Sequence, residues 1–185
     1  MFNERKAAQA AAWFLRQQGG RMPHLKLVKL MYLADRQSLD EHGFPITGDL
    51  AVSMPHGPVL SMTLNLVNGD VESGADGWEA WISDRADHEV ALRERPAESD
   101  ALDELSEADV AVLESVWRRF GGMSKWQIRD YTHEHCAEWQ DPQGSSSPIP
   151  YERIFEALGR SSDEAARLAE RLNEQRSIER RFASL

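Results

Sequence analysis

Apolar residues recur every three or four positions through most of this chain, and that spacing limits the fold to one built mainly from helices. The spacing is clearest in residues 24–43, where Leu27 and Leu30 share one side of a helix that lies between Pro23 and Gly43. Proline suits the start of a helix and glycine its end. The same signals predict helices at 3–19, 58–69, 107–120, 125–139, 151–159 and 161–185.

Side chains that accept hydrogen bonds from free backbone N–H groups support several of these starts. Ser124 and Gln127 have the spacing of a capping box. The other capping candidates are Asn3, Ser106, and Ser161 or Ser162.

Residues 44–60, FPITGDLAVSMPHGPVL, interrupt the helical spacing and are rich in proline and glycine. Pro45 fixes one φ angle, Gly48 permits a positive φ, and His56-Gly57-Pro58 bends the chain into the next helix. The loop therefore has low conformational entropy. Such a loop suits either recognition of a partner or a constrained corner of the scaffold, and composition does not choose between them.

Residues 78–83 and 88–94 are short, rich in aromatic and aliphatic side chains, and predict a β-hairpin at the edge of the fold. The predicted fold class is thus mainly α: a compact helical domain with a small β element in the middle and a C-terminal helix. Residues 1–160 are expected to form the domain. Residues 161–185 are expected to form a helix that either folds back onto it or projects toward a partner.

The formal net charge of −10 argues against sequence-independent DNA binding, which depends on Lys and Arg. Residues 70–109 carry 14 acidic and 3 basic side chains, a balance of −11, so nearly all the excess lies there. This segment is either a solvated connection or a surface that attracts a basic partner.

No apolar run of about 18 residues occurs, and the N-terminus lacks the pattern of a signal peptide, so we expect a cytoplasmic protein. Cys136 is the single cysteine, which excludes an intramolecular disulfide. His133, His135 and Cys136 are possible metal ligands. However, helical residues two apart point about 200° away from each other, so neither a metal nor another cofactor is predicted.

Catalytic patterns are also missing from the sequence. Asp35 and Asp49 are two carboxylates without any signal that brings them together, and no nucleophile elbow, phosphate loop or dinucleotide motif occurs. We therefore expect no enzyme. The tryptophans at 13, 78, 81, 117, 126 and 139 are scattered, so most are assigned to the core and one or two to an interface.

Several motifs in a fixed order resemble one known family. Residues 26–35 read KLVKLMYLAD, residues 45–49 read PITGD, and residues 54–59 read MPHGPV. Further on come SKWQIRDYTHEHCAEW and IPYERIFEAL. Over residues 1 to about 160 the chain resembles the Panacea, or SocA-like, antitoxin domain. His56 departs from the pattern, because an aromatic residue such as Tyr is expected there.

The resemblance implies an antitoxin that binds and neutralises a cognate protein toxin encoded by a neighbouring gene. It implies action as an adaptor that presents the toxin to an ATP-dependent protease of the ClpXP type, with a ClpX-type unfoldase as a second partner. The candidate partner-binding residues are Tyr32, Asp35, Arg36, Thr47, Asp49, His56, Gly57, Pro58, Val59, Trp126, Thr132 and His133. We expect the 44–60 corner and these groups to build a polar pocket that shapes the toxin-facing surface.

Other interpretations stay open. The toxin could be neutralised by direct occlusion without proteolysis, or the protein could bind DNA and regulate its own operon. For the second, the sequence offers scattered basic positions such as Arg118, Arg119 and Arg129. The glycines and prolines of the corner could also serve only to turn the backbone, with Asp49 capping that turn.

Overall fold

The computed structural model describes residues 1–83, 86–93 and 102–183, and within them the chain is mainly helical. The helices are α1 (Glu4–Gln17), α2 (His24–His42), α3 (Ser61–Asn68), α4 (Glu107–Phe120), α5 (Lys125–His135), α6 (Tyr151–Ala157) and α7 (Ser162–Ala183). The strands are β1 (Arg21–Pro23), β2 (Ala51–Met54), β3 (Gly57–Leu60), β4 (Glu89–Ala91) and β5 (Ser147–Pro148). The predicted fold class, mainly α with a small β element, is confirmed.

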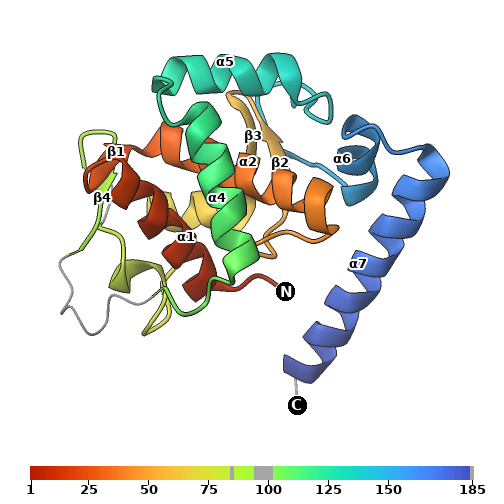
Figure 1. Ribbon diagram of the computed structural model, residues 1–185, viewed down its shortest axis with the longest axis horizontal. Helices are drawn as coiled ribbons and strands as arrows, with labels where there is room; N and C mark the ends of the chain where they lie inside the picture. Colours follow the sequence, from red (N-terminus) through yellow and green to blue (C-terminus); the bar gives the residue numbers. More distant parts are fainter. Residues whose placement is uncertain (84–85, 94–101, 184–185) are drawn as a thin grey trace.

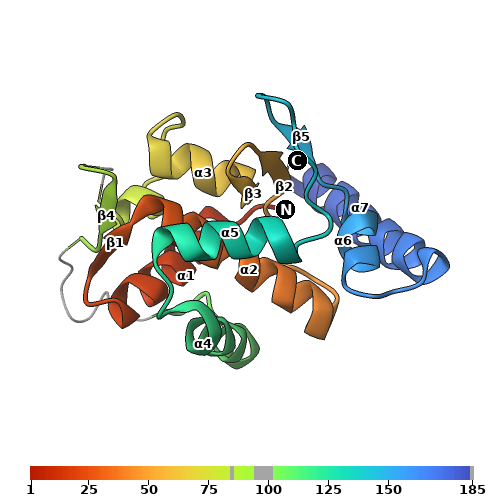
Figure 2. The ribbon, with the colours of Figure 1, turned by 90° about the horizontal axis from the view of Figure 1, so that it is seen from above.

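Helix α2 is the centre of the domain. Its residues 26–35 are all buried, and it contacts α1, α4, α5 and β3. Both views show these elements gathered around it (Figures 1 and 2). A helix that is buried on every side lies inside a domain rather than on its surface. The polar residues of α2 must therefore find hydrogen-bond partners within the protein.

Helix α1 packs its predicted stripe against this centre. Ala7, Ala11, Phe14 and Leu15 are all fully buried, and Asn3 caps the helix by accepting a hydrogen bond from the Lys6 N–H at 3.0 Å. The small alanine side chains let the backbone of α1 come close to its neighbours. The capping residues predicted for α4, α5 and α7, which are Ser106, Ser124 and Ser161, are confirmed.

Residues 51–60 form a β-hairpin, so the prediction of a helix from residue 58 was wrong. Strand β2 pairs antiparallel with β3 on one side and with β5 on the other. Helix α3 begins only at Ser61, because the Asp49 carboxylate accepts the backbone N–H groups of Met62 and Thr63. The apolar residues before Ser61 are buried in the sheet instead.

The hairpin predicted at 78–94 is only partly present. Trp78–Ala80 form a 3-10 turn rather than a strand, because the Glu4 carboxylate holds the Trp78 N–H at 2.8 Å. Ile82 and Leu92 do form an antiparallel bridge. The main partner of β4 is β1, which the sequence did not predict. Residues 84, 85 and 94 lie outside the described part of the chain.

Helix α5 ends at His135, four residues before the predicted end at Trp139. Cys136 leaves the helical conformation with φ −101° and ψ 83°. The Trp139 indole then donates to the Met54 carbonyl at 2.9 Å, which fastens the chain to β2. This departure turns Glu138 into the core, where its side chain is fully buried.

Helix α7 lies along one side of the molecule beyond α6 (Figures 1 and 2). Ala165, Ala169 and Leu172 are buried, whereas Ile178 and Phe182 are exposed. The first half of α7 therefore packs on the domain, and the second half presents apolar side chains to solvent. Leu185 lies outside the described residues.

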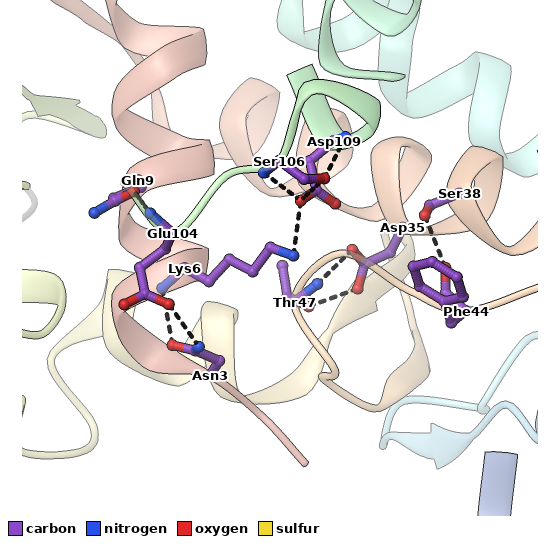
Figure 3. A network of polar contacts seen from close by, with 10 residues as sticks. All are labelled: Asn3, Lys6, Gln9, Asp35, Ser38, Phe44, Thr47, Glu104, Ser106 and Asp109. Atoms are coloured by element: carbon purple, nitrogen blue, oxygen red, sulfur yellow. Dashed lines mark hydrogen bonds and ion pairs between the residues drawn. The ribbon is translucent and has the colours of Figure 1, made fainter. Parts of the chain in front are cut away.

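Part of the acidic segment docks on α1 (Figure 3). Lys6 contacts the Asp109 carboxylate at 2.8 Å, and Gln9 donates to Asp103 at 2.6 Å. The Gln9 side-chain carbonyl also accepts the Glu104 N–H at 2.9 Å. Residues 103–109 are thus an ordered connection into α4, held by polar side chains of α1.

Candidate functional site

The buried helix α2 carries a row of polar side chains, and each fastens another segment to the centre of the domain. These residues are Lys29, Tyr32, Asp35 and Arg36. Their spacing of about three or four residues places them along one part of the helix. Sequence reasoning selected the last three and missed Lys29, although a lysine inside the apolar run LVKLMYL was a usable signal.

Asp35 fastens the start of the 44–60 corner. One of its carboxylate oxygens accepts the Thr47 N–H at 3.0 Å, and the other accepts the Thr47 hydroxyl at 2.5 Å (Figure 3). Ser38, one turn further on, donates to the Phe44 carbonyl at 2.7 Å. Burial raises the pKa of Asp35 to about 7, although the Thr47 hydrogen bonds oppose this shift.

Thr47 also links the Asp35 carboxylate to the backbone of Asp49. Its hydroxyl accepts the Asp49 N–H at 3.1 Å while it donates to Asp35. Asp49 is buried, and its two carboxylate oxygens accept hydrogen bonds from Leu50, Met62 and Thr63. The Asp49 side chain therefore caps α3, and both carboxylates are occupied by contacts within the chain.

Arg36 and Tyr32 share a partner that sequence reasoning missed, Glu138. The Arg36 guanidinium donates two hydrogen bonds to this carboxylate, at 2.6 and 3.2 Å. The Tyr32 hydroxyl donates to the same carboxylate. Burial, followed by the Glu138 charge, raises the pKa of Tyr32 well above its usual value. Nothing in the local sequence around Glu138 distinguishes it from a surface glutamate.

Lys29 fastens the β2–β3 turn. Its side chain is 0% exposed, and its ammonium group donates to the Pro58 carbonyl at 2.8 Å. Gly57, with φ +92°, lies against this group. A Cβ atom at Gly57 would come within 2.9 Å of Lys29 Nζ and Thr132 Oγ1 and within 2.7 Å of the His133 ring. Burial lowers the pKa of Lys29 to about 7.

His133 lies between this turn and the chain that follows α5. Its ring stacks on Trp139 with the two ring centres 4.4 Å apart. Burial, then the Lys29 charge, lowers the pKa of His133, and a hydrogen bond with the His56 backbone opposes the shift. Within the described part of the chain, His133 Nε2 is buried without a hydrogen-bond partner. Cys136 is buried nearby, and burial raises its thiol pKa to about 12.

The structure therefore groups most of the candidate residues around α2, in the corner and at the end of α5. The buried members are Tyr32, Asp35, Thr47, Asp49, Gly57, Pro58, Val59 and Thr132. Arg36 and His133 are partly exposed, and His56 is exposed. Trp126 stands apart near the start of α5, 53% exposed, with Lys125 and Arg129 cations about 5.0 and 4.9 Å from its ring centre.

Across residues 1–83, 86–93 and 102–183, no three His, Cys, Asp or Glu side chains lie together in a way that could hold a metal ion. Over the same residues, none of the helices combines the length and the apolar character that a membrane span needs.

The fold and site define a helical domain in which buried polar anchors on one central helix hold a rigid corner and a small sheet. Residues 27–140 match the model of one family, described as antitoxin SocA-like, Panacea domain. The chain belongs to this family, and the resemblance seen in its motifs is confirmed. No curated protein and no solved structure matches the chain.

Proposed function

We propose that this protein is a cytoplasmic antitoxin that binds the protein toxin encoded by a neighbouring gene and neutralises it by contact. The family match over residues 27–140 carries this proposal. The geometry supports it, because the buried carboxylates of Asp35, Asp49 and Glu138 are occupied by hydrogen bonds inside the chain. Buried groups of this kind suit a scaffold for binding better than a reaction on a substrate.

The signature residues act in this proposal by fixing the shape of the corner. Asp35 holds its start, Asp49 joins its middle to α3, and Lys29 holds its end. A corner held at three points loses little conformational entropy when a partner binds, so more of the contact energy appears as affinity. Three more accessible candidates lie in the β2–β3 turn and in α5. We propose that they contact a partner directly: His56, Trp126 and His133.

Neutralisation is proposed to proceed by delivery of the toxin to a ClpXP-type protease. An adaptor must hold two partners at once, and this chain offers separate surfaces at α5 and at α7 (Figure 1). We propose the division that the sequence suggested, with residues 1–160 as the antitoxin domain and residues 161–185 as a helix that also faces a partner. Occlusion of the toxin without proteolysis is the alternative.

The test is a reconstituted degradation assay with the purified protein, the neighbouring-gene product, ClpXP and ATP. Delivery predicts that the toxin is lost only when this protein is present, while the protein itself persists. Tight binding without faster loss of the toxin would instead establish occlusion. A toxin that neither binds nor disappears would contradict the proposed function as a whole.

A further inference from the structure

The 44–60 corner also faces α7, across a space that side chains do not fill. A cavity of about 390 Å³ separates residues 44–48 from α7. Phe44, Pro45 and Ile46 line it from the corner, and Leu172 and Arg176 line it from α7. A second hollow of about 190 Å³ lies on another side of Phe44 and is lined by Leu168, Leu172 and Gln175. Together they form a groove, which we name the corner–α7 groove.

Exposed apolar side chains lie in this groove and further along α7, beyond the residues that line it. Phe44 is 50% exposed, and Met1, which also lines the cavity, is equally exposed. On α7, Ile178 is 55% and Phe182 is 71% exposed. Phe182 follows Gln175 by seven residues and so continues the row of α7 side chains that lines the groove. Exposed apolar side chains concentrated at one hollow mark an interaction site more often than scattered ones do.

The packing of α7 explains why the groove is open. Its first half is anchored on the domain through Ala165 and Ala169, which are buried. Further along, Arg176 donates to the Tyr151 hydroxyl at 2.9 Å, and Glu179 contacts the Met1 amino group. Polar contacts of this kind position the helix beside the corner without filling the space between them with apolar side chains.

The shape and charge of the groove indicate what fits it. From Leu168 to Phe182 the α7 side extends about 21 Å, the length of roughly four helical turns. Residues 175–183 carry three arginines, Arg176, Arg180 and Arg181, against one acidic residue, Glu179. This basic end contrasts with the net charge of −10 of the whole chain. A helix with apolar residues on one face and carboxylates beside them is complementary to both features.

We propose that the corner–α7 groove binds an acidic amphipathic helix of the toxin. Apolar side chains of that helix occupy the space beside Phe44, Leu172 and Phe182, and its carboxylates face Arg176 and Arg180. This assignment rests on the proposed function and adds to it the surface and the kind of segment that is recognised. In this proposal the rigid corner takes part in binding, because it forms one wall of the groove.

The test measures the dissociation constant of the neighbouring-gene toxin for the full chain by calorimetry. Phe182→Glu is expected to weaken binding by roughly tenfold, because it replaces an exposed apolar side chain of the α7 row with a charge that repels an acidic partner helix. Arg180→Glu is expected to weaken it by about fivefold and to reduce its dependence on salt. Met62→Glu is the matched control, because Met62 is an exposed apolar residue that does not line the groove, and its effect should stay within about twofold.

The results distinguish failure of the groove assignment from failure of the proposed function. Phe182 and Ile178 are largely exposed, so circular dichroism and melting temperatures of their Glu variants should match those of the unchanged protein. If the toxin binds the unchanged protein but binds Phe182→Glu and Ile178→Glu equally well, the groove assignment is wrong and the proposed function stands. If the toxin does not bind the unchanged protein, the proposed function fails and the groove assignment falls with it.

Discussion

Residues 44–60 contact α2 on one side and face α7 on the other, and the two contacts are built differently. Toward α2 the corner is fastened by buried groups, with Asp35 bonded to Thr47 and Lys29 bonded to Pro58. Toward α7 it borders a groove that is lined by the exposed Phe44, and the exposed Phe182 follows further along α7. The first side resembles a protein interior and the second resembles an interface. Stability and toxin binding should therefore respond to different substitutions.

The largest expected effect is on stability and comes from Glu138→Ala. This change leaves the partly exposed Arg36 guanidinium and the buried Tyr32 hydroxyl without their shared partner, the fully buried Glu138 carboxylate. Breaking a buried ion pair from one side costs about 3–5 kcal/mol, which should appear as a lower free energy of unfolding in urea. Glu134→Ala, at a side chain that is 72% exposed, is the control and should cost less than about 0.5 kcal/mol. Unchanged stability with weaker toxin binding would place Glu138 in the interface instead.

The next effect concerns pH and Lys29. Its pKa is lowered from 10.5 to about 7 in the folded protein, so between these values the unfolded chain binds more protons than the folded one. The free energy of unfolding should therefore rise with pH, by about 2 kcal/mol between pH 7 and pH 9. Lys29→Met removes this contribution. The measurement is the difference between the urea stabilities of the two proteins across that range.

The other charged or titratable groups near Lys29 are present both in the unchanged protein and in Lys29→Met. Arg129, His133 and Cys136 are the charged or titratable neighbours whose interactions with it shift pKa values. A difference between the two proteins that does not change from pH 7 to pH 9 would contradict a neutral, buried lysine.

Asp49→Ala tests whether the corner caps α3. The change removes the acceptor for the N–H groups of Met62 and Thr63. Loss of a helix cap costs about 1–2 kcal/mol, and the amide protons of α3 should exchange faster with solvent. If toxin affinity fell sharply in a variant of unchanged stability, Asp49 would be a contact residue rather than a cap.

The smallest expected effect on stability is that of Trp126→Ala. Its ring is 53% exposed, so unfolding should change by less than about 0.5 kcal/mol. Toxin affinity should stay within twofold, because the corner–α7 groove is elsewhere, while degradation in the ClpXP assay should slow. A toxin affinity reduced tenfold would transfer the toxin-binding surface from the groove to α5.

Local signals made much of the helical part of this fold predictable. Asn3, Ser106 and Ser124 cap helices through contacts three residues away, and Gly43 ends α2 with φ +79°. The residues that form such a cap lie within one helical turn of each other in the sequence, so the cap can be predicted without knowledge of the fold. The motif order was likewise sufficient to identify the family, which the match over residues 27–140 confirms.

The missed features all depend on partners that are far apart in the sequence. Strand β1 pairs with β4, which lies some seventy residues later in the chain. Glu138 accepts a hydrogen bond from Arg36, which is 102 residues away. Helix α3 starts at Ser61 because Asp49 reaches its N–H groups across the hairpin. The corner–α7 groove likewise requires two segments brought together by the fold. No periodicity or cap in the sequence reports such pairings.

Hydrogen exchange of the antitoxin–toxin complex, read by mass spectrometry, tests the central claim most directly. If the corner is a scaffold on its α2 side and an interface on its α7 side, toxin should slow exchange in residues 44–48 and in the second half of α7. Exchange in residues 29–36 should already be slow in the free protein and should change little. Slowed exchange at α5 and the β2–β3 turn, with none along the groove, would contradict this account.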